Sequence, residues 1–245
     1  MSNDWWKNFF DENYLDFWDS QGAFDQTKAE VRFLEKSIPL KKGQLILDLC
    51  CGHGRHSLQI SRRGYKVIGL DYSGYELGLA GKEAQRLGLK VDFRQGDARY
   101  FKFREKFDLI INMFTAFGYG SKDDDRRIIR NAAAHLKKDG KFFIDYLNFP
   151  WLIRNYKAKD RKRFGKKVAL IERKYDFLTD VNTEQRIIIA KGKKKIYKLH
   201  LRLYTLAQMA ELFESEGLKV VKYWGKLGEP YSFDTKRMLI LATKK

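Results

Sequence analysis

The sequence has few cysteines and histidines, and it contains no long apolar run. Cys50 and Cys51 are the only two cysteines among the 245 residues, and because they are adjacent they cannot form an ordinary cross-link or supply metal-ligand spacing. The four histidines, at positions 53, 56, 135 and 200, are scattered, so neither a zinc site nor a metal cofactor is predicted. No apolar stretch approaches the ~18 residues needed to span a bilayer, and the N-terminus lacks a basic head followed by an apolar segment. These absences predict a soluble, unprocessed protein of the reducing cytoplasm with no membrane partner.

Acidic residues are scarce relative to basic ones. The chain has 49 Lys and Arg against 31 Asp and Glu, and its formal net charge is +18. Nucleic-acid-binding proteins use a field of this sign to displace counterions from phosphates. The basic residues concentrate in 157–174 and 191–198, which could face RNA or could be a lysine-rich solvated surface. We favour the solvated surface, because charge runs usually serve solubility and also accompany thermophily.

Strand and helix patterns alternate from residue 27 to about residue 148. The patterns predict helices over 27–37, 57–63, 74–87 and 123–138, and strands from residue 45 and over 65–70, 91–95, 107–112 and 141–147. With 44% hydrophobic residues, the 245-residue chain can bury one core, so residues 1–245 are expected to form a single domain. This order predicts an α/β fold with a doubly wound, mostly parallel sheet.

The segments outside this range do not show the same alternation of strand and helix patterns. Runs over 167–175, 183–190 and 195–204, separated by turn-favouring residues, predict an antiparallel β insertion within 150–204. A helix over 205–216 and strands over 219–224 and 237–243 follow, and the last two strands are expected to form a hairpin that gives the sheet an antiparallel edge. Residues 1–26 carry many aromatic residues, which predict either a lid over the site or a helix docked on the core.

The stretch LILDLCCGHGRH, residues 45–56, is an apolar strand that leads through Asp48 into a glycine-punctuated turn. Gly52 and Gly54 leave the backbone bare, so a ligand can lie against it and against the N–H groups at the start of the next helix. A dinucleotide fingerprint needs a third glycine at Ser57, and a P-loop needs a lysine that is absent. The carboxylate of Asp48 disfavours a pyrophosphate and suits a ligand with an ammonium and a sulfonium group.

Later strand ends carry matching chemistry. Asp71 ends the second strand, nineteen residues after Gly52, where a carboxylate can accept hydrogen bonds from ribose hydroxyls, and the ring of Tyr72 could lie on an adenine. The third strand ends in Gly96-Asp97-Ala98, and the fourth ends at Asn112. Each of these residues could instead be an ordinary cap or turn residue, but four such strand ends together favour a nucleoside site.

These residues resemble motif I and the following motifs of class I S-adenosylmethionine-dependent methyltransferases of the small-molecule type, and the layout is similar to amino-sugar N-methyltransferases. The resemblance implies a seven-stranded Rossmann-like sheet of order 3-2-1-4-5-7-6 and the cofactor S-adenosylmethionine, with S-adenosylhomocysteine as product. Cys50 takes the place of the first glycine of the motif, and it is not expected to adopt a positive φ at low cost. The implied cofactor-binding residues are Asp48, Cys50, Gly52, Gly54, Arg55, Asp71, Tyr72, Asp97, Ala98, Asn112 and Met113.

Methyl transfer depends on holding the nucleophile in line with the departing sulfur, so no catalytic triad is expected. The loop after the fourth strand, 113–120, lies where strand ends form the ligand crevice. We expect positioning roles for Phe117, Tyr119 and Tyr14, and a supporting role for His56 in the cofactor loop. The predicted substrate-binding residues are Thr115, Tyr146, Trp151, Arg202 and Tyr231.

The sequence predicts a small-molecule acceptor methylated at an amine or a hydroxyl, by a monomer or homodimer. Two alternatives stay open: an RNA methyltransferase that docks through the basic insertion, and a cofactor-binding protein without activity. The first is less favoured, because no NPPY-type or DPPY-type tetrapeptide follows strand 107–112 to form the target-base site of many nucleic-acid amino-methyltransferases.

Overall fold

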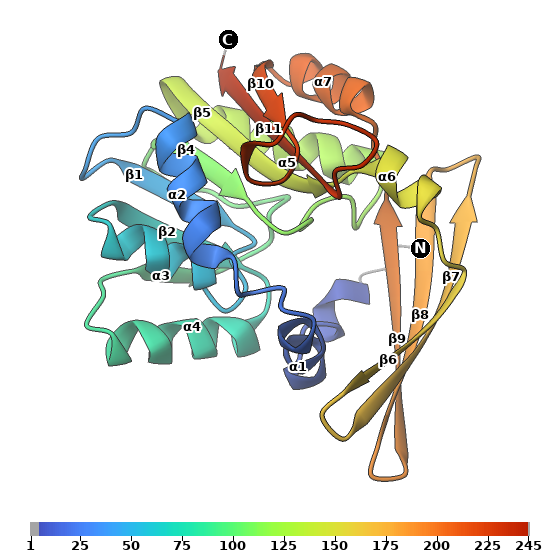
Figure 1. The fold of residues 1–245 in the computed structure, drawn as a ribbon. Helices are drawn as coiled ribbons and strands as arrows, with labels where there is room; N and C mark the ends of the chain where they lie inside the picture. The colour runs from blue at the N-terminus through green and yellow to red at the C-terminus, as the bar shows by residue number, and fades with distance from the viewer. Residues whose placement is uncertain (1–4, 245) are drawn as a thin grey trace.

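Residues 5–244 are described by the computed structural model, and they form two β-sheets with helices around the larger one (Figure 1). The larger sheet has seven strands in the order β10-β11-β5-β4-β1-β2-β3. Its strands are β1 (Leu45–Leu49), β2 (Lys66–Asp71), β3 (Asp92–Gln95), β4 (Phe107–Asn112), β5 (Leu136–Leu147), β10 (Leu218–Trp224) and β11 (Arg237–Lys244). The predicted α/β fold and strand order are confirmed, since β11 and β10 take the places of the seventh and sixth strands.

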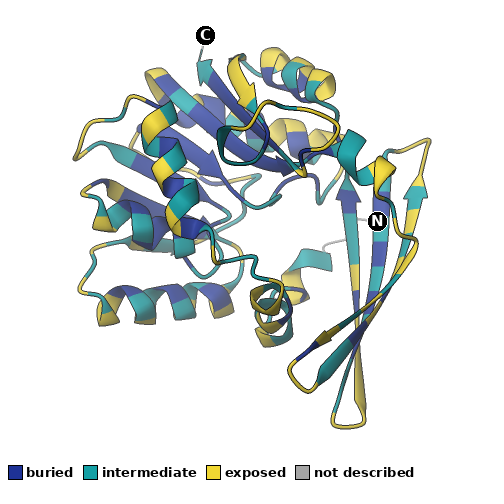
Figure 2. Cartoon of the chain, viewed as in Figure 1, coloured by how far each residue is buried: buried dark blue, intermediate teal, exposed yellow. Residues whose placement is uncertain are grey.

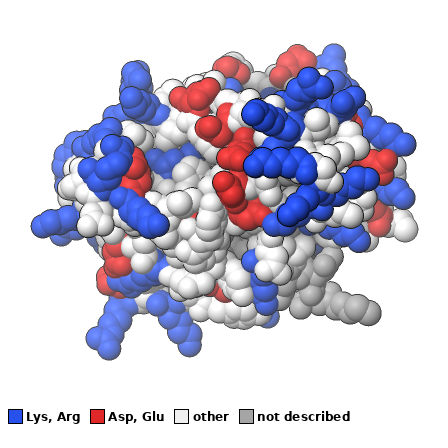
Figure 3. All heavy atoms as spheres, turned by 90° about the horizontal axis from the view of Figure 1, so that it is seen from below, with Lys and Arg blue, Asp and Glu red and all other residues white. Residues whose placement is uncertain are grey.

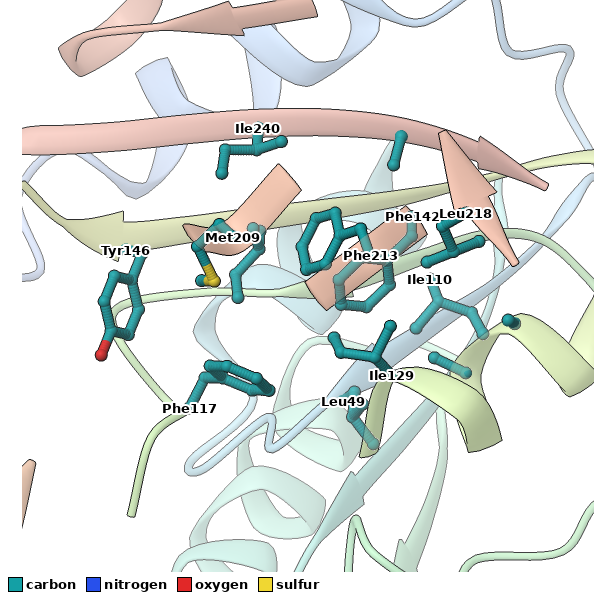
Figure 4. Close-up of a cluster of buried hydrophobic side chains, with 14 of the residues drawn as sticks. Leu49, Ile110, Phe117, Ile129, Phe142, Tyr146, Met209, Phe213, Leu218 and Ile240 are labelled. Atoms are coloured by element: carbon teal, nitrogen blue, oxygen red, sulfur yellow. The ribbon is translucent and has the colours of Figure 1, made fainter. Parts of the chain in front are cut away.

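Each face of the larger sheet has its own apolar core, because successive side chains of a strand point to opposite faces. On one face, Ile110 and Phe142 pack with residues of two helices such as Ile129 and Phe213 (Figure 4). The opposite face has a second cluster, to which Ile111 of β4 and Leu34 belong. The helices are α2 (Thr27–Ser37) and α3 (Arg55–Arg62) on this second face, α5 (Lys122–His135) and α7 (Leu206–Ser215) on the first, and α4 (Gly74–Arg86) beside β3. The central strands are accordingly the most buried part of the molecule (Figure 2).

The second sheet is antiparallel and packs against the N-terminal segment. Its strands, in the order β6-β7-β8-β9, are β6 (Lys159–Phe164), β7 (Lys167–Asp176), β8 (Val181–Ala190) and β9 (Lys193–Arg202). The N-terminal segment contains η1 (Trp5–Asn8) and α1 (Glu12–Ser20). The ring centroids of Phe17 and Phe164 lie 5.5 Å apart, and those of Phe9 and Tyr197 lie 5.7 Å apart. These contacts hold α1 in the space between the second sheet and the larger one (Figure 1).

Several predicted boundaries are corrected by the structure. Helix α5 ends at His135, not at residue 138, because Leu136 is buried in the core and pairs with Phe107 as the start of β5. Strand β6 and the short helix α6 (Phe149–Arg154) were not predicted. The sequence of β6, KDRKRF, has only one apolar residue, so an alternation of burial could not be recognised there.

The predicted antiparallel pairing of the last two strands at the edge of the larger sheet is confirmed. Strand β11 is antiparallel to both β5 and β10, so the edge strand β10 runs parallel to the rest of the sheet. The two strands are joined by residues 225–236, which include η2 (Lys226–Gly228), and not by a tight turn. Among residues 5–244, no helix is both long and apolar enough to cross a membrane.

Candidate functional site

The glycine turn after β1 forms the floor of a cavity at the carboxyl ends of β1, β2 and β4. Gly52 and Gly54 have φ values of +54° and +75°, and a Cβ on Gly54 would lie 2.8 Å from the ring of Phe93. Cys50 also has a positive φ, of 63°. The expectation that Cys50 avoids this conformation is therefore wrong, and the turn holds a non-glycine residue in a strained region, as is common at ligand sites.

Two carboxylates flank this turn. The Asp48 carboxylate accepts a hydrogen bond from Ser57 Oγ at 2.6 Å, and burial raises its pKa above the ordinary value. The Asp71 carboxylate accepts hydrogen bonds from the backbone N–H groups of Gly52 at 2.7 Å and of Ser73 at 2.8 Å. Burial nevertheless raises the pKa of Asp71 to about 6. Both residues line the cavity, so its floor is a bare backbone between two acidic groups.

Asp71 gives the ligand-free protein a pH dependence of stability. Because its pKa is about 6 in the folded chain against 3.8 ordinarily, the folded state holds the proton more tightly than the unfolded state does. The resulting stabilisation is fully present below about pH 4 and is lost as the pH rises through about 6. Differential scanning fluorimetry should therefore show a larger fall in Tm over this range for the wild type than for Asp71→Asn. Asp125, whose pKa burial raises to about 7, acts in the same direction but is common to both proteins. Equal slopes for the two proteins would contradict the assignment.

The end of the cavity near β3 is lined by Tyr72, Asp97, Ala98 and Arg99. Asp97 accepts hydrogen bonds from Arg99 Nε at 3.0 Å and Nη2 at 2.6 Å. Burial acts to raise the pKa of Asp97, but the hydrogen bonds from Arg99 outweigh it, and the net shift is downward. The Arg99 guanidinium also lies 5.2 Å from the ring centroid of Trp6. Asp97 thus stands ionised at the cavity wall, in a position held by its neighbour.

The loop after β4 forms the opposite wall. Phe114 and Thr115 both have φ near 62°, and the N–H of Phe114 donates to Asp145 Oδ2 at 3.1 Å. Further along, the N–H of Arg202 donates to the carbonyl of Gly118 at 2.7 Å, which ties the loop to the end of β9. These anchors place Phe114, Phe117 and Tyr119 in the cavity wall.

The N-terminal segment contributes part of the cavity lining, namely Trp6, Phe10, Tyr14 and Phe24. The rings of Trp5 and Tyr119 meet edge to face with centroids 4.8 Å apart. Burial raises the pKa of the Tyr14 and Tyr119 hydroxyls, so both stay protonated. Both residues line the cavity, and within residues 5–244 neither hydroxyl makes a hydrogen bond to the protein.

The structure brings most, but not all, of the predicted residues together. Those in the cavity wall are Tyr14, Asp48, Cys50, Gly52, Arg55, Asp71, Tyr72, Asp97, Ala98, Met113, Phe117 and Tyr119. Gly54 and Asn112 lie behind it: Gly54 precedes α3, and the Asn112 amide donates to the carbonyls of Leu49 and Ala116. His56, for which a supporting role was predicted, also lines the cavity and is buried against Glu30, with 2.9 Å between Nε2 and Oε2.

The five predicted substrate-binding residues remain a prediction, and none of them is among the residues that line the cavity described for residues 5–244. These residues are Thr115, Tyr146, Trp151, Arg202 and Tyr231. The fully buried Tyr146 donates a hydrogen bond to the carbonyl of Arg202 and so supports the loop from behind. The Tyr231 hydroxyl donates to Asn148 Oδ1 at 2.9 Å.

Several wall residues were missed. The most informative is Glu76 in the first turn of α4, which is 3% exposed although an acidic residue there normally caps the helix in solvent. Phe24, His53 and Arg99 also line the cavity. No sequence pattern marks them, because their role depends on how the N-terminal segment and the loop after β4 fold over the turn.

Two buried polar atoms of the wall have no hydrogen-bond partner in the described part of the chain: Arg55 Nη2 and Glu76 Oε1. The other Arg55 amino nitrogen, Nη1, donates to Thr27 Oγ1 at 2.7 Å and Glu30 Oε2 at 2.6 Å, and the guanidinium lies 5.3 Å from the ring centroid of Phe114. This donor set suits a small molecule that carries both a cationic and an anionic group. Groups of His, Cys, Asp and Glu able to hold a metal ion are absent from residues 5–244.

The turn and its flanking strands coincide with a known family pattern, since residues 46–140 match the family model described as a methyltransferase domain. Residues 46–140 are thus similar to a methyltransferase domain. They contain β1 to β4, α3 to α5 and most of the cavity wall.

Two proteins with similar sequences are also named as methyltransferases. The ubiquinone biosynthesis O-methyltransferase of Pelagibacter ubique (strain HTCC1062) is 30% identical over 54% of this chain and 60% of its own length. The chain thus spans about three fifths of that relative. The cypemycin N-terminal methyltransferase of a Streptomyces species is 25% identical over 95% of this chain and 96% of its own length.

Solved structures show the same fold around the methyltransferase domain. An S-adenosylmethionine-dependent methyltransferase from Clostridium acetobutylicum ATCC 824 superimposes with a TM-score of 0.85 at 18% identity, covering 95% of this chain and 98% of that one. An amino pentose methyltransferase from Micromonospora echinaspora, solved with S-adenosylmethionine bound, gives a TM-score of 0.70 at 21% identity over 97% and 99% of the two chains. The predicted resemblance to class I small-molecule methyltransferases is therefore confirmed.

Proposed function

We propose that the protein transfers a methyl group from S-adenosylmethionine to an amine of a small molecule. The observation that carries this proposal is the turn at Gly52, where bare backbone lies between the carboxylates of Asp48 and Asp71 in the cavity of the methyltransferase domain. The cofactor supplies a methyl group activated by a sulfonium. The chain would contribute chiefly by aligning the acceptor with that methyl group and by excluding water, which well-oriented systems convert into large rate gains.

The cavity wall offers a partner for each part of the cofactor. Tyr72 and Ala98 would border the adenine, and the Asp71 carboxylate would accept hydrogen bonds from the ribose hydroxyls. Arg55, with its unpartnered Nη2, would take the carboxylate of the amino-acid part. These roles, and those of the other predicted cofactor residues, are part of the proposal.

The acceptor side favours an amine. Aromatic rings of Phe10 and Phe117 line it, and the hydroxyls of Tyr14 and Tyr119 stay protonated and unpaired within the described chain. Aromatic faces and nearby carboxylates attract an amine and disfavour an acidic hydroxyl acceptor. The name of the N-terminal methyltransferase relative, whose match spans nearly the whole chain, supports the same choice. Tyr14 and Tyr119 would then orient the nitrogen by hydrogen bonding, as positioning residues.

Binding and transfer can be tested separately. Isothermal titration with S-adenosylmethionine should show saturable binding, and absence of binding at millimolar cofactor would refute the proposal. With cofactor labelled in its methyl group and a metabolite extract as acceptor, mass spectrometry should find the label on nitrogen. Label found on oxygen would retain the methyltransferase and reject the amine.

The alternative of an RNA methyltransferase is not favoured. Lys and Arg side chains gather on both flanks of the molecule when it is seen from below, with Asp and Glu in a band between them (Figure 3). Part of the basic insertion is neutralised within the chain: Lys167 Nζ lies 2.7 Å from Asp16 Oδ2, and Lys195 pairs with Asp11. The relatives named above are called a ubiquinone biosynthesis O-methyltransferase, a cypemycin N-terminal methyltransferase and an amino pentose methyltransferase, and none of these names mentions RNA. In a binding assay with tRNA fragments, we expect either no binding or binding without the steep salt dependence that phosphate contacts cause.

A further inference from the structure

Glu76 places a third carboxylate beside the turn at Gly52. It is 3% exposed and lines the cavity, and a Cβ on Gly52 would lie only 2.4 Å from its Oε2 atom. The missing side chain at Gly52 therefore makes room for this carboxylate. Oε2 lies 3.4 Å from His53 Nδ1, which is longer than an ordinary hydrogen bond, and Oε1 is buried without a partner in the described chain.

Glu76 differs from the other two carboxylates in what surrounds it. Asp48 accepts a hydrogen bond from the Ser57 hydroxyl, and both oxygens of Asp71 accept hydrogen bonds from backbone N–H groups. Glu76 has only the distant His53 ring and an unpartnered oxygen. The turn consequently carries excess negative charge. This charge adds to burial in raising the pKa of Asp71 and of the Cys51 thiol.

A buried carboxylate without a donor is costly to the ligand-free fold, and a ligand of opposite charge offsets that cost. A neutral ligand of the same shape does not. The cavity wall also includes Tyr14 and Tyr119, whose protonated hydroxyls carry no charge. The Glu76 carboxylate, whose Oε1 atom has no donor within the described chain, would therefore be available to attract a positive charge on a ligand that lies over Gly52.

We infer that Glu76 makes the cavity prefer the sulfonium of S-adenosylmethionine over the neutral thioether of S-adenosylhomocysteine. This inference rests on the proposed function and deepens it. Glu76 then acts on the charge of the ligand, whereas Asp71 and Arg55 act on groups that the cofactor and its product share. Loss of the sulfonium charge on methyl transfer removes the attraction, so the residue promotes exchange of product for fresh cofactor.

The experiment compares three ligands by isothermal titration on the wild type and on Glu76→Gln, which keeps the shape and removes the charge. The ligands are S-adenosylmethionine, S-adenosylhomocysteine, and sinefungin, which carries an amine in place of the methylated sulfonium. For the variant we expect the affinity for both cationic ligands to fall about 10-fold while the affinity for S-adenosylhomocysteine stays within about 3-fold. Glu83→Gln, on the exposed side of the same helix and paired with Arg86, is the matched control and should change none of the three.

Two outcomes overturn the inference alone: all three affinities fall together, which would mark a role in binding ribose or the amino-acid part, or none of them changes. If the wild type binds none of the ligands, the proposed function fails as well.

A second readout needs no ligand. Removing an unpartnered buried charge should raise the Tm of ligand-free Glu76→Gln above that of the wild type. A fall in this Tm would show that the Glu76 charge stabilises the ligand-free fold, and it would contradict the inference.

Discussion

Replacing Asp71 with alanine is expected to lower the affinity for S-adenosylmethionine by a factor on the order of 100. The Asp71 carboxylate holds the Gly52 and Ser73 N–H groups, so it both shapes the turn and presents its remaining lone pairs to the cavity. Hydrogen bonds to a charged group contribute about 1.5–3 kcal/mol each, and two ribose hydroxyls would lose their acceptor together. Isothermal titration of the variant measures the loss directly.

The variant needs controls, because the same substitution removes two acceptors of backbone donors. Asp71→Asn keeps an oxygen acceptor without the charge and should fall between the wild type and Asp71→Ala. Asp92→Ala on the neighbouring strand β3 removes an exposed carboxylate that bonds Arg94, and it should bind like the wild type. An Asp71→Ala protein that melts within a few degrees of the wild type and still binds within about threefold of it would refute the assignment of Asp71 to the cofactor.

Most of the central fold could be predicted because the chain marks its elements locally. Helix 27–37 and strand 107–112 lie at the predicted bounds, since one is closed by Pro39 and the other is a short apolar run between polar residues. The order of the sheet came from the resemblance to the methyltransferase family. The antiparallel direction of β11 was also predicted, because the last two strands were expected to form a hairpin.

Some residues of the candidate site could likewise be predicted from the sequence, and others could not. Asp48, Gly52 and Asp71 lie at or just after the carboxyl ends of strands, so their meeting at one sheet edge could be predicted. Glu76 could not, because its burial depends on Gly52 leaving space for it, a contact between different elements. Tyr146 and Arg202 were placed in the pocket by their order in the chain, but they contact each other behind the loop. Local sequence predicts which strand ends carry polar groups better than it predicts which way distant side chains turn.

The positive φ of Cys50 has a related cause. Cys50 stands where the motif has a glycine, and a non-glycine residue is expected to avoid a positive φ because of the strain it causes. In the structure, β1, β2 and the start of α3 fix both ends of the turn, so Cys50 adopts a φ of 63° regardless. The tertiary context decides this torsion, which is why residue preference alone predicted it wrongly.

Asp145 supports the strained loop after β4, and its replacement by alanine is expected to lower the free energy of unfolding by about 3–5 kcal/mol. Asp145 is 4% exposed and accepts hydrogen bonds from Arg237 Nε at 2.7 Å and from the Phe114 N–H at 3.1 Å. Its removal leaves a largely buried guanidinium without its carboxylate and releases the turn in which Phe114 and Thr115 hold positive φ. Urea unfolding followed by tryptophan fluorescence measures the change.

The same variant should also lose activity beyond its loss of stability, since Phe114 lines the cavity and its position depends on Asp145. Asp234→Ala is the matched control: Asp234 pairs with Arg154 at 2.9 Å on the surface, where an ion pair contributes about 0–1 kcal/mol. Asp145→Asn, which can still accept from the Phe114 N–H but lacks the charge for Arg237, should lie between the two. A change in unfolding free energy below about 1 kcal/mol for Asp145→Ala would mean that the loop after β4 is held by its other contacts. The strained torsions at Phe114 and Thr115 would then depend on packing against the N-terminal segment, where Trp18 meets the Phe114 ring at 5.5 Å.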